Sequence, residues 1–263
     1  MRFISSPAPD LARQIELCWF TKGEKEAGKA FYEILPDSNV KLIFRFSPSG
    51  CRMVLLGPLT ERACVEIDGE SDYFGVHFRP GRAPRLADVH LSELINGHID
   101  LSEIRGISAD SLADRLLSLP DFASQQLIME ELLRGMLPLV HSARCLQATA
   151  LLDAHGGQLR VGELASALGL NIRSLERLFL RNLGMTPKQF ARLVRLRHLL
   201  SILYGGIPGS LADLASICGY ADQSHMIKDF KELTGRLPGE PGSCDVRRLE
   251  GVPRTRVVHR YRP

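Results

Sequence analysis

A segment that occurs twice in the last third of the chain constrains the fold more than any other feature. Each copy begins with an apolar pair, Leu164-Ala165 or Leu214-Ala215, passes through a glycine turn, and closes on a glycine followed by a proline. Phe179 and Phe230 stand 51 positions apart, and the same offset relates the closing glycines and prolines. The spacing predicts two helix-turn-helix units, in which one short helix braces the next through a sharp turn.

Each unit is predicted to end in a second amphipathic helix whose apolar face points inward. The apolar residues fall at the spacing of one helical face. A polar residue precedes each helix and can accept hydrogen bonds from the free N–H groups of the first turn. The inward residues are Leu175, Phe179, Met226 and Phe230, and the expected caps are Asn171 and Asp222.

Thr186-Pro187 predicts the start of a long connecting helix, because threonine is a good N-cap and proline suits the first turn. Apolar residues continue at helical spacing from Lys188 to Tyr204, and the glycine-rich segment 205–209 ends the pattern. Ser210 and Asp213 predict a cap for the next helix. A rigid connecting helix would let both recognition helices enter major grooves about one helical turn, roughly 34 Å, apart.

The segment from about Leu146 to Pro238 resembles the DNA-binding domain of AraC-type bacterial transcription regulators. Several motifs carry this resemblance, and they occur in the correct order. They are Leu175-Glu176-Arg177-Leu178-Phe179, Gly184-Met185-Thr186-Pro187, Arg195-Leu196, Leu214-Ala215-Ser216-Ile217-Cys218-Gly219-Tyr220, Asp222-Gln223-Ser224, Phe230-Lys231 and Gly235. The resemblance implies a sequence-specific, DNA-binding transcription regulator that contacts RNA polymerase to activate transcription.

The resemblance also implies which side chains of the two recognition helices face DNA. Arginine suits guanine, glutamate can accept from cytosine, and glutamine can pair with adenine. The expected DNA-binding set is Arg173, Glu176, Arg177, Arg181, Lys188, Gln223, Ser224, Ile227 and Lys228. Two alternatives stay open within this set: Arg177 as a structural or phosphate-contacting residue, and Glu176 as a solvated surface residue.

Charge is distributed unevenly along the chain. Residues 145–263 contain 17 Lys and Arg against 10 Asp and Glu, whereas residues 1–144 contain 16 against 20. The basic half is therefore the predicted DNA-binding half. Six arginines after residue 246 add to this charge, in a tail with little apolar periodicity that we expect to be flexible.

The N-terminal half is predicted to be β-rich, because it contains short runs of β-branched and aromatic residues. The runs are Val40–Phe46, Met53–Leu56, Cys64–Asp68 and Tyr73–Phe78, with a hairpin-like turn at 47–50. From Ser92 the pattern is typical of helices, most clearly over Phe122–Leu139. Such helices would form a dimer contact, clamp the two domains together, or pack within their own domain.

This half resembles the N-terminal domain of a subset of AraC-type regulators through Leu35-Pro36-Asp37, Gly57-Pro58 and Phe74–Gly81. The resemblance implies a sensor or oligomerisation domain and names no effector. We therefore expect an α+β protein with a β-rich domain and following helices at 1–140. An all-α domain of two helix-turn-helix units joined by a long helix is expected at 141–241, and a basic tail at 242–263.

No motif of a known enzyme class, no cofactor motif and no metal-binding pattern is present, so we expect a protein that is not an enzyme. The apolar runs are short and broken by charge, which indicates no membrane span and a cytoplasmic protein. Double-stranded DNA is the expected partner, and a small-molecule effector and a homodimer stay open. The alternative function is a thiol-based sensor or repair protein fused to a DNA-binding domain, which requires an exposed, reactive thiolate among Cys18, Cys51 and Cys64.

Overall fold

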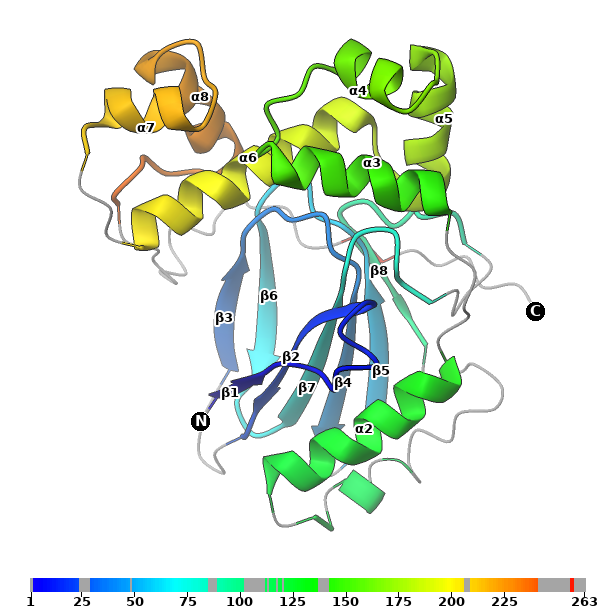
Figure 1. The fold of residues 1–263 in the computed structure, drawn as a ribbon. Coiled ribbons are helices and arrows are strands. Elements are labelled where there is room, and N and C mark those ends of the chain that lie inside the picture. Colours follow the sequence, from blue (N-terminus) through cyan, green and yellow to red (C-terminus); the bar gives the residue numbers. More distant parts are fainter. Residues whose placement is uncertain are drawn as a thin grey trace.

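A computed structural model places a β-rich N-terminal region beneath a helical C-terminal region (Figure 1). The expected division into a β-rich half and an all-helical half is therefore confirmed. The residues that the structure describes are 2–23, 29–47, 49–84, 89–101, 112, 114–116, 118–119, 121–136, 142–205, 209–240 and 256–257.

The N-terminal region contains a seven-stranded sheet and a separate two-stranded sheet. Neighbouring strands of the large sheet are antiparallel except for the last pair, which is parallel. In spatial order the large sheet is β1 (Arg2–Ser5), β2 (Ile15–Thr21), β7 (Asp72–Phe78), β4 (Lys41–Ser47), β5 (Gly50–Leu56), β8 (Gly97–Asp100) and β9 (Arg256–Val257). The small sheet pairs β3 (Lys29–Ile34) with β6 (Ala63–Asp68).

The four predicted strand runs correspond to β4, β5, β6 and β7 and are confirmed. The expectation of helical structure from Ser92 onward is wrong between Gly97 and Asp100, which form β8. Gly97 and Ile99 are buried there while His98 and Asp100 are partly exposed, the two-residue alternation of a strand. Four residues are too few to separate this period from that of a helix in the sequence.

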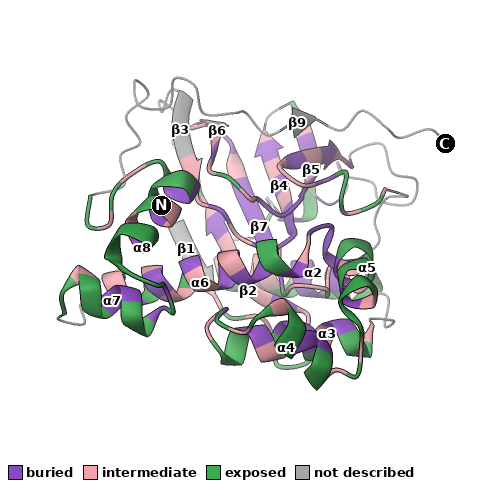
Figure 2. Cartoon of the chain, turned by 90° about the horizontal axis from the view of Figure 1, so that it is seen from above, coloured by how far each residue is buried: buried purple, intermediate pink, exposed green. Residues whose placement is uncertain are grey.

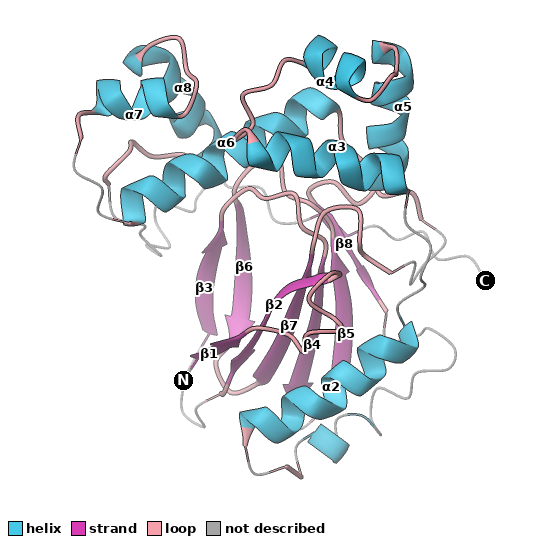
Figure 3. Ribbon diagram, in the orientation of Figure 1, coloured by secondary structure: helices cyan, strands magenta, loops and turns pink. Residues whose placement is uncertain are grey.

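Helix α2 (Phe122–Met136) packs on the large sheet of its own region. Met129 and Leu133 are fully buried there, and the ring of Phe122 lies 5.9 Å from that of Phe20. Figure 3 shows α2 below the sheet and the C-terminal helices above it. The predicted helix is thus an intramolecular packing element and not a clamp between the two regions, and Leu127 on its outer side is 65% exposed.

The described part of the C-terminal region contains six helices that share one apolar core. Figure 2 colours the buried residues of these helices purple. The ring of Phe179 lies 5.8 Å from that of Phe190 on the connecting helix, in an edge-to-face arrangement. Phe179, Met226 and Phe230 are almost fully buried, as their helical spacing predicts. The helices are α3 (Ala143–Ala154), α4 (Val161–Ala167), α5 (Ile172–Leu183), α6 (Pro187–Tyr204), α7 (Leu211–Ile217) and α8 (Gln223–Thr234).

Local capping chemistry determines where these helices begin and end, and the predicted caps are confirmed. The side chains of Asn171, Thr186, Ser210 and Asp222 each accept a backbone N–H at the start of α5, α6, α7 and α8. Both recognition helices end on a glycine with a φ of 73°, a left-handed conformation that costs other residues energy. The expected basic tail, 242–263, lies outside the described residues except for Arg256–Val257.

Candidate nucleic-acid interface

The first recognition helix, α5, presents a basic face to solvent. Leu175, Phe179 and Leu183 turn into the core, because they share one side of the helix. The predicted DNA-binding residues of α5 all lie on its exposed side. These exposed residues are Arg173, Glu176, Arg177 and Arg181.

The second recognition helix, α8, has the same construction with fewer charges. Met226 and Phe230 are buried, while Gln223, Ser224 and Lys228 are exposed. Ile227 is only partly exposed and packs against the core, so it is the least accessible member of the predicted set. Lys188 is exposed at the start of α6 and lies on neither recognition helix.

The predicted cationic residues differ in their contacts from four arginines of the same region, whereas Arg144 and Lys231 resemble the predicted residues in making no ion pair with a described residue. Among the described residues, Arg173, Arg177, Arg181, Lys188 and Lys228 make no ion pair, and only Arg177 has a side-chain contact, 3.5 Å from the Ser174 hydroxyl. By contrast, four other arginines each bind a carboxylate, a carbonyl or a ring within the protein. They are Arg192, Arg195, Arg197 and Arg236. Cations without an internal partner are available to an external anion.

A polar network that the sequence did not suggest holds the second recognition helix against α6. Asp229 of α8 accepts hydrogen bonds from Arg192 of α6 and from the hydroxyl of Tyr220, the latter at 3.0 Å. Burial and the neighbouring Asp229 carboxylate raise the pKa of Tyr220 well above its usual range, so this phenol stays protonated and donates. The corresponding position in the first unit is Leu178, an apolar residue packed on the core.

Both recognition helices meet the N-terminal region through the glycines that end them. A Cβ at Gly184 would lie 2.4 Å from the Leu91 backbone, and a Cβ at Gly235 would lie 2.4 Å from the guanidinium carbon of Arg62. These two glycines are the repeat-related positions, 51 residues apart. The N-terminal region thus touches equivalent points of both units.

The thiol alternative finds little support in the cysteines that it requires. Cys18 is fully buried, and burial raises the pKa of its thiol to about 12. Cys51 is also buried, and Cys64 is partly exposed. Within the described ranges, no three side chains are grouped to hold a metal ion, and no helix combines the length and apolar character that crossing a membrane requires.

Two family models match separate parts of the chain. Residues 164–241 match a helix-turn-helix domain of the AraC type, and residues 4–100 match a domain of unknown function (DUF6597) that occurs in AraC-type regulators. No curated protein sequence matches the chain significantly.

Several solved structures are similar to the chain. A transcriptional regulator from Chromobacterium violaceum with an AraC-type domain is 23% identical over 38% of this chain and 95% of its own, with a TM-score of 0.34. A probable AraC family regulator from Rhodopseudomonas palustris is 26% identical over 37% and 92%, with a TM-score of 0.34. ToxT from Vibrio cholerae is 12% identical over 84% and 94%, with a TM-score of 0.46.

The family matches agree with the geometry of the helical region, where two capped recognition helices present exposed cations on either side of a connecting helix. Residues 164–241 therefore form a helix-turn-helix domain of the AraC type, and residues 4–100 form a domain of the kind found in AraC-type regulators. Together these matches support a DNA-binding transcription regulator.

Proposed function

We propose that α5 and α8 enter successive major grooves of one DNA duplex and read its sequence. The observation that carries this proposal is the set of cations on the outer faces of these helices that have no ion-pair partner in the described part of the chain. Arg173, Arg177 and Lys228 are the proposed base-reading cations, with Glu176, Gln223, Ser224 and Ile227 beside them. Arg181 and Lys188 are the proposed phosphate contacts.

The connecting helix supports the two-groove arrangement. Its 18 residues span roughly 27 Å at the rise of an α-helix. The two units lie at its opposite ends in Figure 1. The length of α6 approaches the roughly 34 Å between successive major grooves on one face of DNA.

We further propose that the N-terminal domain modulates this binding. It contacts both units at their terminal glycines, so a change in its position bears on the spacing of the recognition helices. Among the described residues, the buried core of the helical region begins at Cys145 and ends at Leu233, which supports a boundary near residue 140. The proposed domains are 1–140, 141–241 and 242–263. Activation through RNA polymerase, a small-molecule effector and a homodimer belong to the same proposal and follow from the family.

Selection of DNA fragments by the purified full chain at physiological salt tests the proposal. Wild type should recover one motif, and hydroxyl-radical footprinting on it should show two protected stretches about 10 base pairs apart. Arg177→Ala should weaken binding to that motif by about 1–3 kcal/mol and relax the preference at one base pair. Salt must be held constant, since phosphate contacts alone make binding strongly salt-dependent.

Lys228→Ala is best compared with Lys231→Ala, which removes the same charge from the same helix outside the proposed set. A loss confined to Lys228→Ala supports base reading by the first half of α8. Equal losses for both variants on every DNA sequence would reduce this helix to nonspecific charge attraction and contradict the proposal.

A further inference from the structure

A cavity of about 1060 Å³ lies between the large sheet and the connecting helix. Its floor includes Trp19, Ile43 and Val54 from three strands of the large sheet, and β3 and β6 form a side wall through Ile34, Val65 and Ile67. Leu193, Val194 and Leu200 of α6 close it from the C-terminal region. The cavity is therefore shared between the two regions and has a mainly apolar lining.

The charged groups at the margin of this cavity are almost all neutralised by one another. Lys41 pairs with Asp37 at 2.7 Å, and Arg45 pairs with Asp68 at 2.7 Å. Arg52 binds Asp100, Arg197 binds Asp153, and Glu33 binds two arginines. Glu70 is the exception and is exposed. An anionic occupant deep in the cavity would have to break the shielded pair of Lys41 or be buried without a counter-ion, and either is costly. Among the described lining residues, a cationic occupant would find an unpaired carboxylate only at Glu70, on the exposed margin.

A flat aromatic wall adds to the selectivity for an apolar occupant. The indole of Trp19 lies across Gly75, where a Cβ would come within 2.1 Å of the ring, so any other residue at 75 would displace it. Its Nε1 donates to Nε2 of His77 at 3.2 Å, which fixes the ring orientation beside the cavity. Flat aromatic faces pack well against planar apolar groups.

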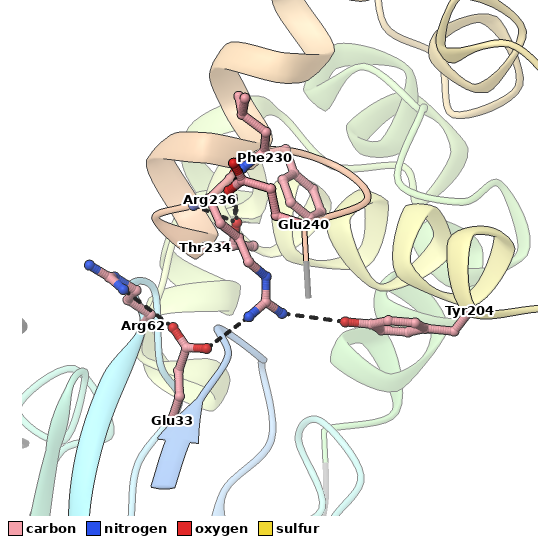
Figure 4. Close-up of polar contacts among 8 residues, drawn as sticks. Glu33, Arg62, Tyr204, Phe230, Thr234, Arg236 and Glu240 are labelled. Atoms are coloured by element: carbon pink, nitrogen blue, oxygen red, sulfur yellow. Dashed lines mark hydrogen bonds and ion pairs between the residues drawn. The ribbon is translucent and has the colours of Figure 1, made fainter. Parts of the chain in front are cut away.

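One cavity residue connects directly to the second helix-turn-helix unit (Figure 4). The carboxylate of Glu33 accepts hydrogen bonds from Arg236, which follows the glycine that ends α8, at 2.9 Å and from Arg62 at 3.3 Å. The side chains of Glu33 and Arg236 are 9% and 11% exposed, so this pair is well shielded from water. Arg236 also reaches the hydroxyl of Tyr204 at the end of α6, 3.3 Å away.

We propose that this cavity binds an uncharged, mainly apolar small molecule and that Glu33 transmits its occupancy to the second helix-turn-helix unit. The inference rests on the proposed function only for the effect on DNA, since ligand binding itself is independent of it. A molecule that fills the cavity contacts the β3 wall and the α6 roof, and so shifts the Glu33 carboxylate relative to Arg236. The first unit is held by backbone contact at Gly184 and has no such ionic connection among the described residues.

The chain offers a direct optical test, because Trp19 is its single tryptophan and lines the cavity. Phenylnaphthylamine, an uncharged apolar fluorophore, should bind the full chain and accept excitation energy from Trp19. Anilinonaphthalene sulfonate, which is its anionic relative, should bind about tenfold more weakly or worse, since its charge finds no partner. Equal binding of the two probes would overturn the proposed ligand class.

A cavity-filling variant and a matched control locate the binding site. Val54→Phe combined with Val65→Phe adds two rings to the cavity lining and should abolish energy transfer. Leu127→Phe makes a similar addition on the exposed side of α2 and should leave energy transfer unchanged. Circular dichroism melting confirms that each variant is folded. Undiminished transfer in a folded double variant would overturn the assignment of the site.

The transmission step is tested by measuring DNA affinity with and without phenylnaphthylamine. In wild type the probe should change the dissociation constant for the selected DNA motif by about fivefold or more, the lower end of typical coupling between sites. In Glu33→Gln, which keeps the shape but removes the charge, the change should fall below about twofold while energy transfer persists. The same fold-change in both proteins would refute transmission through Glu33.

The two proposals fail in different measurements. A folded chain that binds phenylnaphthylamine in the cavity but selects no DNA motif would refute the proposed function and leave the ligand site established. A chain that selects a motif but shows no energy transfer would refute the ligand site and leave DNA reading established.

Discussion

The two helix-turn-helix units share one plan but differ in how they are held. The first is fixed by apolar packing, with Phe179 against Phe190 and with Gly184 against the backbone of Leu91. The second shares this apolar core through Met226 and Phe230 and is held in addition by ionic and hydrogen-bonded contacts, those of Asp229 inside the helical region and that of Arg236 with Glu33 across the domain interface. Backbone packing has no adjustable part, whereas an ion pair can be exchanged for water or another partner. We therefore expect the position of the second unit to change more easily than that of the first.

The two terminal glycines provide the largest expected difference between the units. Alanine at either position must adopt the left-handed conformation, at a cost of about 1–2 kcal/mol. At Gly184 the new methyl group also meets backbone atoms that cannot move aside, which adds about 1–3 kcal/mol. At Gly235 it meets the flexible end of Arg62. Urea denaturation should therefore show a clearly larger loss for Gly184→Ala, and equal losses would contradict the comparison.

Removing the polar network around Asp229 should reduce the stability of the second unit, by less than the Gly184 substitution does. Asp229→Ala leaves Arg192 and Tyr220 without their shared acceptor, and we expect a loss of about 1–3 kcal/mol in the free energy of unfolding. Tyr220→Phe alone should cost about 1 kcal/mol and should cost less when Asp229 is already absent. Additive losses in this double-mutant cycle would show that the two side chains are not coupled. Hydrogen exchange should place the change in α8 and leave α5 protected.

Cysteine labelling offers the smallest and most local comparison, because one buried thiol lies in each half of the helical region. Burial raises the pKa of Cys145 to about 12, and burial also raises the pKa of Cys218 while Arg195 opposes the shift. At pH 8 both thiols should react with iodoacetamide only after local opening, and Cys218 should react several-fold faster if the second unit opens first. Mass spectrometry of the labelled peptides measures both rates in one sample. Identical rates would indicate that the two units open together.

The pH dependence of stability follows from the sign of the thiol shifts. Because the folded pKa of Cys145 lies above that of a free thiol, about 8.5, its burial favours the folded state most below that pH. This contribution falls as pH rises from about 8.5 toward 12. Replacing Cys145 with Ala should therefore reduce the alkaline loss of stability in urea denaturation experiments.

The helix caps and the buried helix residues could be predicted from the sequence, because both depend on neighbours within one or two helical turns. Caps such as Asn171 and Ser210 and inward residues such as Phe179 act within one or two helical turns, and each lies where its local pattern indicates. The strand β8 is too short to show a period. Glu33 and Arg236 are 203 positions apart, and although Arg236 lies between the closing glycine and proline of the second repeat, no local pattern relates it to Glu33, so only the tertiary fold brings them together. The DNA-facing assignments came from family resemblance and stay predictions until binding is measured.

The connecting helix α6 belongs to the helical region and also lines the cavity between it and the large sheet. Four residues that line the cavity, Leu193, Val194, Arg197 and Leu200, belong to α6, which also joins the two helix-turn-helix units. The division of the sequence into a β-rich and a helical region therefore does not coincide with the boundary of the cavity. A recombination event that replaced only residues 1–140 would change the strands that line the cavity but keep the α6 residues that close it. This architecture therefore favours inheritance of the two halves together.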